Sequence, residues 1–139
     1  MDILIIENTP ISPYVSFNPN DGIFEISGYS RPEDGKKFFY PLIEFINNYQ
    51  QVIESRHNIK SIKSDNLLFI FKFRYINSAS TKFICEFLFQ VLKFKNIGVS
   101  FTIKWFYENN DEEMRELGED ISDIIDYPLC FYSFTPENK

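Results

Sequence analysis

Histidine is almost absent from this sequence, which has one histidine, two cysteines and five glycines in 139 residues. The single histidine, His57, lies in a polar stretch that we interpret as a solvated loop. Because protein zinc sites combine several Cys and His ligands, one isolated histidine argues against a zinc site. A Ser-His-Asp catalytic triad would have to use this one loop histidine as its base, which argues against such a triad. The sequence also has no Gly-rich loop of the kind that binds phosphates. We therefore expect no metal and no cofactor.

Positive charge and long apolar runs are also scarce. The net charge is −6, whereas surfaces that bind nucleic acid or anionic membranes need basic patches. No stretch approaches the roughly 20 apolar residues of a membrane helix, and the N-terminal apolar run is too short for a signal peptide. We expect a cytoplasmic protein without nucleic-acid or membrane partners, in which Cys85 and Cys130 are reduced, buried, small apolar side chains.

The apolar content, in contrast, is ample. Apolar residues make up 44% and aromatic residues 18% of the chain, which is enough for a packed core at this length. No repeat, low-complexity tract or Gly/Ser linker divides the sequence. We therefore expect a single domain over residues 1–139.

The first half of the sequence predicts a hairpin followed by a helix. Short alternating segments at Tyr14–Phe17 and Ile23–Ile26 flank a spacer of Asn, Pro, Asp and Gly, which is typical of a β-hairpin. The stretch Ser30–Asp34, with a serine before proline and early carboxylates, predicts a helix start. Pro41 lies inside this helix and is expected to kink it or to mark a restart.

The second half alternates strands and helices. Strands are predicted at Leu67–Tyr75, Val99–Tyr107 and Leu129–Phe134, and apolar stripes predict helices over Phe83–Leu92 and Met114–Ile125. Strict alternation along Leu67–Tyr75 places Tyr75 on the same face of the strand as Phe73. Strands that alternate with helices form right-handed crossovers. We therefore predict an α/β, STAS-like domain: an N-terminal β-hairpin, then a mixed, largely parallel sheet with about three helices, mainly on one face.

A cluster of small polar residues directly follows the strand Leu67–Tyr75. It reads Asn77, Ser78, Ala79, Ser80 and Thr81. Backbone N–H groups and the helix dipole favour negative charge at such a helix start, and we expect the N–H groups of Ser80, Thr81 and Lys82 to be free. A serine there suits reversible phosphorylation, but an ordinary N-cap serine, bonded to the N–H of Ser80 or Thr81, occupies the same place. From the residues alone both interpretations stay open.

An acidic run along the last helix is a second candidate site. Its carboxylates are Asp111, Glu112, Glu113, Glu116, Glu119, Asp120 and Asp123. Carboxylates without histidine suit Mg²⁺ or Ca²⁺, but this spacing does not match an EF-hand. We interpret them as solvated and capping side chains, or as a recognition surface for a basic partner.

Five blocks of the sequence, in order, resemble the SiaC family of bacterial regulatory phosphoproteins, long catalogued as a domain of unknown function. The blocks are Thr9-Pro10 with Val15–Pro19, Ile26–Gly28 with Ser30–Glu33, Phe39–Leu42, Tyr75–Lys82, and the run of Trp105–Glu108, Asp111–Met114 and Gly118–Asp120. They span nearly the whole chain. Each block alone is weak, but the five in order are fairly specific.

The resemblance implies a non-catalytic signalling protein switched by phosphorylation. In the family, a Ser/Thr protein kinase phosphorylates the residue directly after the asparagine, and a PP2C-type phosphatase removes the phosphate. The unphosphorylated form binds an effector, in the best-known systems a diguanylate cyclase of cyclic di-GMP signalling, and raises its activity. Carried onto this sequence, the phosphoacceptor is Ser78, with Ser80 and Thr81 as second choices.

The expected partner surface surrounds that acceptor. It consists of Asn77, Ala79, Lys82, Arg74 and Tyr75. Asn77 is expected to fix the turn, and Lys82 to steady a phosphate or simply to face solvent. Trp105 and Tyr107, at the neighbouring strand tip, are further candidates, although core packing is the expected role of Trp105.

Two other functions stay open. A small enzyme that uses carboxylates and a divalent cation requires a deep pocket with converging acidic residues. A constitutive scaffolding subunit requires only that Ser78 cap the helix and that a permanent interface exist. The resemblance favours the phosphorylation switch, so we expect no enzymatic activity.

Overall fold

The computed structural model of the chain describes residues 1–56 and 66–136. The strands are β1 (Leu4–Ile6), β2 (Tyr14–Asn18), β3 (Ile23–Ser30), β4 (Leu67–Ile76), β5 (Phe101–Glu108) and β6 (Cys130–Phe134). The α-helices are α1 (Gly35–Ser55), α2 (Ser78–Leu92) and α3 (Glu112–Ile125), and a 3-10 helix, η1 (Lys93–Ile97), follows α2 directly.

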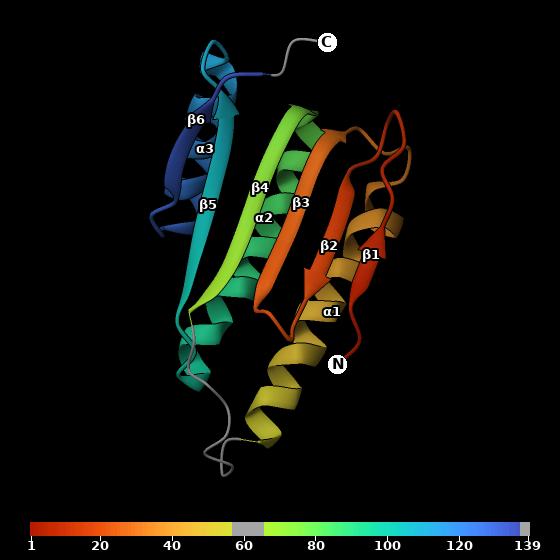
Figure 1. The fold of residues 1–139 in the computed structure, drawn as a ribbon, viewed down its shortest axis with the longest axis vertical. Coiled ribbons are helices and arrows are strands. Elements are labelled where there is room, and N and C mark those ends of the chain that lie inside the picture. The colour runs from red at the N-terminus through yellow and green to blue at the C-terminus, as the bar shows by residue number, and fades with distance from the viewer. Residues whose placement is uncertain (57–65, 137–139) are drawn as a thin grey trace.

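The strands form one six-stranded sheet in the order β1-β2-β3-β4-β5-β6. The pairs β1–β2 and β2–β3 are antiparallel, whereas β3–β4, β4–β5 and β5–β6 are parallel. The α-helices cover one face of the sheet and leave the other face open (Figure 1). This architecture confirms the predicted mixed, largely parallel α/β fold with an N-terminal hairpin. The sequence does not predict β1, which adds a further antiparallel strand to that hairpin.

Aromatic side chains fill the space between the sheet and the helices. The largest fully buried ones are Trp105, Phe17, Phe24, Phe39, Phe69, Phe71, Phe73, Phe87 and Phe94. Phe24 of β3 stacks on Phe69 of β4 with ring centroids 4.8 Å apart. Such ring pairs add about 0.5–1.5 kcal/mol each beyond their buried area. Phe87 of α2 packs on Phe69 and Phe71 of β4, with ring centroids 6.4 and 6.1 Å apart, and these contacts hold β4 against α2.

The helix α1 begins later than the sequence indicates. Asp34 is its N-cap, and its carboxylate accepts a hydrogen bond from the N–H of Lys37 at 3.1 Å. Ser30 is instead the buried last residue of β3. A carboxylate therefore makes the capping bond that the sequence assigned to the serine. Pro41 lies inside the continuous helix, which does not restart there.

The register of β3 against β4 shifts between Gly28 and Tyr29. Gly28 lies opposite Phe73 and Tyr29 lies opposite Tyr75, so β4 has one extra residue at this point. Gly28 has φ +101°, a conformation that glycine adopts without steric cost. Tyr75 is 46% exposed and does not share the buried environment of Phe73. The predicted alternation therefore fails at the end of the strand.

Two apolar side chains lie elsewhere than predicted. Cys130 is exposed, whereas Cys85 is buried as expected. Cys130 pairs with Lys104 on the open face of the sheet, where no described helix covers it. The sequence pattern also places Ile124 in the apolar stripe of the last helix with Ile121 and Ile125, but the structure leaves it exposed on α3.

Two further expectations concern loops and membranes. His57, expected in a solvated loop, lies outside the described residues, as does most of the polar connector before β4. None of the described helices has both the length and the apolar character that a membrane crossing requires.

Candidate functional site

The junction between β4 and α2 is organised by Asn77, which is the N-cap of the helix. Its side-chain oxygen accepts a hydrogen bond from the N–H of Ser80 at 2.8 Å. Its carbonyl oxygen accepts from the N–H of Thr81 at 3.1 Å. Two of the amides expected to be free, those of Ser80 and Thr81, are therefore occupied. The capping role left open for Ser78 belongs to Asn77.

Ser78 is the first residue of α2, and both Ser78 and Ala79 are exposed. Within the described part of the chain, the Ser78 hydroxyl has no hydrogen-bond partner. The N–H groups of Ser78 and Ala79 stand in the first helical turn, ahead of the first carbonyl that a regular helix offers. The junction thus combines a free hydroxyl with backbone donors and the positive end of the helix dipole.

Ser80, in contrast, is buried and cannot be reached by another protein. Its side chain is only 1% exposed and bonds to Ser30 at the end of β3. The Ser30 hydroxyl donates to the Ser80 hydroxyl at 2.8 Å, and the Ser80 hydroxyl donates to the Ser30 carbonyl at 3.2 Å. The N–H of Asn77 bonds to the same carbonyl at 3.0 Å. These bonds hold the start of α2 against β3 and leave Ser80 inaccessible to a kinase.

Thr81 is half-buried, and its hydroxyl is also engaged. It donates to the carbonyl of Asn77 at 3.2 Å. Of the three hydroxyl residues considered as acceptors, Ser78 alone is both exposed and unbonded.

The outer face of α2 extends the site beyond the junction. Residues four apart, or eleven apart, share one side of an α-helix. Ser78 therefore lies in line with Lys82 and Phe89, and with Lys93, the C-cap of α2 and first residue of η1; all of these residues are exposed. We call these four residues the α2 stripe. Phe89 is 47% exposed, which is unusual for so large an apolar side chain on a helix between two others.

Sequence reasoning missed Phe89, although a signal was present. The apolar stripe of α2 runs through positions 83, 84, 87, 88, 91 and 92, and Phe89 falls outside it. An aromatic residue off the core stripe of an amphipathic helix indicates a contact surface. Beside the stripe, a shallow groove of about 560 Å³ separates α1 from α2, with Tyr40 exposed on its rim.

Arg74 and Tyr75 lie next to the junction, as expected, but they face a different groove. The Nε of Arg74 pairs with Oε1 of Glu108 at 3.1 Å. Arg74 and Tyr75 border an open groove of about 330 Å³, whose other wall is the N-terminal half of α3. The carboxylates Asp111, Glu113, Glu116 and Asp120 line that wall.

This groove is not the deep acidic pocket that a metal-dependent enzyme requires. Asp111 is the N-cap of α3 and accepts from the N–H of Met114 at 3.0 Å. Among the described residues, no group of three or more His, Cys, Asp or Glu side chains is arranged to hold a metal ion. The acidic groove therefore fits a recognition surface better than a metal centre.

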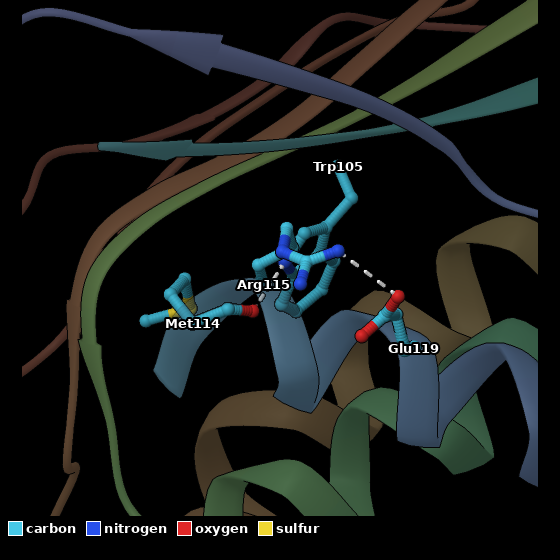
Figure 2. Close-up of polar contacts among 4 residues, drawn as sticks. All are labelled: Trp105, Met114, Arg115 and Glu119. Atoms are coloured by element: carbon cyan, nitrogen blue, oxygen red, sulfur yellow. Dashed lines mark hydrogen bonds and ion pairs between the residues drawn. The ribbon is translucent and has the colours of Figure 1, made fainter. Parts of the chain in front are cut away.

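Trp105 is part of the core and not of a docking surface. Figure 2 shows its indole pointing at the first turns of α3, where Nε1 donates to the carbonyl of Met114 at 3.0 Å. A Cβ added at Gly118 would lie 2.6 Å from the indole ring, so the ring packs directly on the backbone of α3. On the outer side of this helix, Arg115 pairs with Glu119 at 3.2 Å (Figure 2). The predicted core role of Trp105 is confirmed.

Known proteins of the same fold share this arrangement of strands and helices. One match is a chain in the crystal structure of diguanylate cyclase SiaD in complex with its activator SiaC from Pseudomonas aeruginosa. It has a TM-score of 0.78 and 19% identity, and covers 94% of this chain and 99% of that chain. Apo-SiaC from the same organism has a TM-score of 0.76 and 20% identity, and covers 96% and 98%. No curated protein gives a significant match.

The sequence match extends over almost every described element. The family described as SiaC family regulatory phosphoprotein matches residues 6–134. That range begins at the end of β1 and ends at the last residue of β6, so it includes the whole junction between β4 and α2. The chain therefore belongs to the SiaC family of regulatory phosphoproteins.

Proposed function

We propose that this chain is a non-catalytic regulatory protein that is switched by reversible phosphorylation of Ser78. A Ser/Thr protein kinase adds the phosphate, and a PP2C-type phosphatase removes it. The unphosphorylated form binds an effector protein through the junction and the α2 stripe, and regulates the effector's activity. The protein works in the cytoplasm.

The observation that supports this proposal best is that residues other than Ser78 make the structural hydrogen bonds at the junction. Asn77 caps the helix and Ser80 anchors it, so neither task falls to Ser78. A serine that only capped the helix would have its hydroxyl bonded to a backbone N–H. The free, exposed hydroxyl of Ser78 instead suits a kinase, which needs to bring the oxygen next to the γ-phosphate of ATP.

A phosphate on Ser78 is compatible with the fold. It brings about −1.5 to −2 charges to the start of α2, where the helix dipole and the N–H groups of Ser78 and Ala79 favour an anion. Lys82, one turn along the helix, is exposed and within reach of such a group. The modification is therefore expected to leave the helix intact.

The effect of the phosphate falls instead on a partner that packs against the α2 stripe. Before modification, the stripe presents a small hydroxyl, an aromatic ring and two cations. Afterwards a partner that fits the unmodified stripe has to cover a dianion for which it carries no counter-charge of its own, which costs several kcal/mol. Because 1.4 kcal/mol changes a dissociation constant about tenfold, this is enough to separate a complex of ordinary strength.

A diguanylate cyclase is the effector class that we propose. The support is the fold shared with the SiaC family and the description of the related SiaC as an activator of diguanylate cyclase SiaD. On this basis the unphosphorylated chain activates its cyclase, and phosphorylation ends the activation.

The test is binding of Ser78 variants to a diguanylate cyclase from the same organism. Ser78→Ala is expected to bind and activate the cyclase constitutively, whereas Ser78→Asp binds at least about tenfold more weakly. Ser100→Asp is the matched control, because Ser100 is exposed just before β5, at the end of the sheet away from the junction. Equal binding by the Ser78→Asp and Ser100→Asp variants would contradict the proposal.

A further inference from the structure

The open face of the sheet carries a patch of cationic and aromatic side chains. Lys72 comes from β4, Lys104 and Phe106 from β5, and Tyr132 and Phe134 from β6. The strand register places Lys72 beside Phe106, and Phe106 beside Tyr132, so the patch crosses all three strands. No described helix lies over these strands on this side (Figure 1). We call these five residues the cation–aromatic face.

The two lysines of this face have no acidic partner. The Nζ of Lys72 lies 4.4 Å from the centre of the Phe134 ring, and the Nζ of Lys104 lies 5.3 Å from that of Tyr132. Within residues 1–56 and 66–136, neither ammonium group pairs with a carboxylate. The rings hold each cation by its attraction to the π-face and leave its remaining hydrogen-bond donors to solvent.

The aromatic rings add a flat apolar surface between the cations. Phe106 and Tyr132 stack with their centroids 5.2 Å apart, and Tyr132 is 42% exposed. Aromatic side chains anchored on a rigid sheet lose little conformational entropy when a partner covers them. The face therefore combines preformed apolar contacts with uncompensated positive charge.

Charge is segregated across the molecule, and this identifies the kind of partner. The chain has a net charge of −6. On the open side of β4, β5 and β6, however, Lys72 and Lys104 have no carboxylate partner among the described residues, and Glu108 is paired with Arg74 at the end of β4. Glu25 of the neighbouring β3, opposite Ile70, adds one carboxylate to this face. The carboxylates of α3 lie on the helical side of the sheet. An acidic segment is attracted to the cation–aromatic face and repelled from α3, which sets both its place and its orientation.

A second copy of the chain fits this face poorly. Twofold pairing brings each patch against the same patch, so Lys72 and Lys104 of one copy would face like charges of the other. A contact between this face and α3 of another copy is heterologous, so it produces a ring or an open polymer and not a twofold dimer.

We propose that the cation–aromatic face is a docking site for an acidic protein segment with interspersed aromatic or aliphatic residues. This site goes beyond the switch proposed above and lies in the opposite layer of the fold. A segment bound here leaves the α2 stripe accessible, so both surfaces can be occupied at once.

The test is an NMR titration of the isotope-labelled, unphosphorylated protein with a short peptide of Glu-Glu-Phe repeats. Backbone shifts are expected at Lys72, Lys104, Phe106 and Tyr132. The double variant Lys72→Gln/Lys104→Gln is expected to bind about tenfold more weakly, because it removes two charge contacts at the face. Lys36→Gln/Lys37→Gln changes the charge equally on the exposed side of α1 and is expected to bind like the wild type.

Several results would overturn this proposal. The first is binding of a neutral Gln-Gln-Phe peptide with the same affinity as the acidic peptide. The second is a set of backbone shifts confined to α1 or α2. The third is the same loss of affinity in Lys36→Gln/Lys37→Gln as in Lys72→Gln/Lys104→Gln. Self-association that needs Lys72 and Lys104 would assign the face to a second copy instead. Phosphatidylserine vesicles that bind through the same lysines, when the acidic peptide does not, would assign it to a membrane. Since no kinase or cyclase is present, these outcomes are independent of the role of Ser78.

Discussion

The hydroxyl groups of Ser30 and Ser80 bond to each other at 2.8 Å in the interior of the protein, although the two residues lie 50 positions apart. One closes β3 and the other belongs to the first turn of α2. A second bond, from the Ser80 hydroxyl to the Ser30 carbonyl, makes the link reciprocal. The two bonds fix the first turn of α2 against the end of β3. Ser78, two residues before Ser80, is left exposed at the start of the helix.

The first prediction concerns this buried pair. Ser80→Ala leaves the Ser30 hydroxyl buried without its acceptor, and we expect a loss of about 1–3 kcal/mol in the free energy of unfolding. Ser30→Ala is expected to cost a similar amount. The double variant should cost less than the sum, because the two hydroxyls mainly satisfy each other. Urea denaturation of the three variants measures this coupling, and strict additivity would show that the bond does not form.

The second prediction separates the cap from the acceptor. Asn77→Ala removes the side-chain bond to the N–H of Ser80, so we expect a loss of about 0.5–2 kcal/mol. Ser78→Ala removes an unbonded, exposed hydroxyl and should change stability by less than about 0.5 kcal/mol. Ser78→Asp places a carboxylate at the positive end of the helix dipole and should stabilise by about 0.3–1 kcal/mol.

Thermal unfolding of these three variants is the measurement. If Ser78→Ala proved more damaging than Asn77→Ala, Ser78 would be the cap. The same data serve the binding experiment, since a stable Ser78→Asp variant shows that any loss of partner binding does not come from unfolding.

The third prediction concerns Trp105 and Gly118. Alanine is normally the better helix residue by about 1 kcal/mol. At position 118, however, its Cβ would lie 2.6 Å from the Trp105 ring and 2.7 Å from Phe131. We expect Gly118→Ala to destabilise the protein by about 1–3 kcal/mol despite the gain in helix propensity. Calorimetry of Gly118→Ala beside Asp123→Ala, a control at an exposed position of the same helix, tests this. An unchanged or raised melting temperature of the Gly118→Ala variant would contradict the packing.

The fourth prediction compares the two cysteines. Burial raises the pKa of the Cys85 thiol, so less of it is the reactive thiolate at neutral pH. Cys130 is exposed on the open face of the sheet. We expect iodoacetamide at pH 7 to modify Cys130 first, and Cys85 only after denaturation. Mass mapping of the labelled peptides follows both sites, and fast labelling of Cys85 in the native protein would show that α2 opens.

Much of the fold follows from local patterns in the sequence. The alternation of Phe69, Phe71 and Phe73 predicts a strand because residues two apart share a face. The turn residues after Asn18 predict the hairpin for an equally local reason, since the Asn18 side chain bonds to the N–H groups of Asn20 and Asp21. The family resemblance adds the location that we propose for the phosphorylation switch, at the end of β4.

The rest depends on contacts that no local pattern encodes. Whether Asn77 or Ser78 caps α2 is decided by which side chain reaches the N–H of Ser80. The burial of Ser30 depends on its partner in α2, and the exposure of Tyr75 depends on the register shift at Gly28. The short strand β1 has little pattern of its own and forms because β2 offers a free edge. Among the features that the sequence analysis missed, the exposure of Phe89 could have been predicted, because this residue lies outside the apolar stripe of α2.

The most direct test of the central claim is phosphosite mapping of the protein purified from its native host, with the Ser78→Ala variant beside it. We predict one phosphorylated residue, Ser78, in a fraction of the wild-type molecules, and none in the variant. A phosphate on Ser80 or Thr81 with Ser78 unmodified would contradict the account. So would an unmodified wild-type protein under conditions in which its kinase is active.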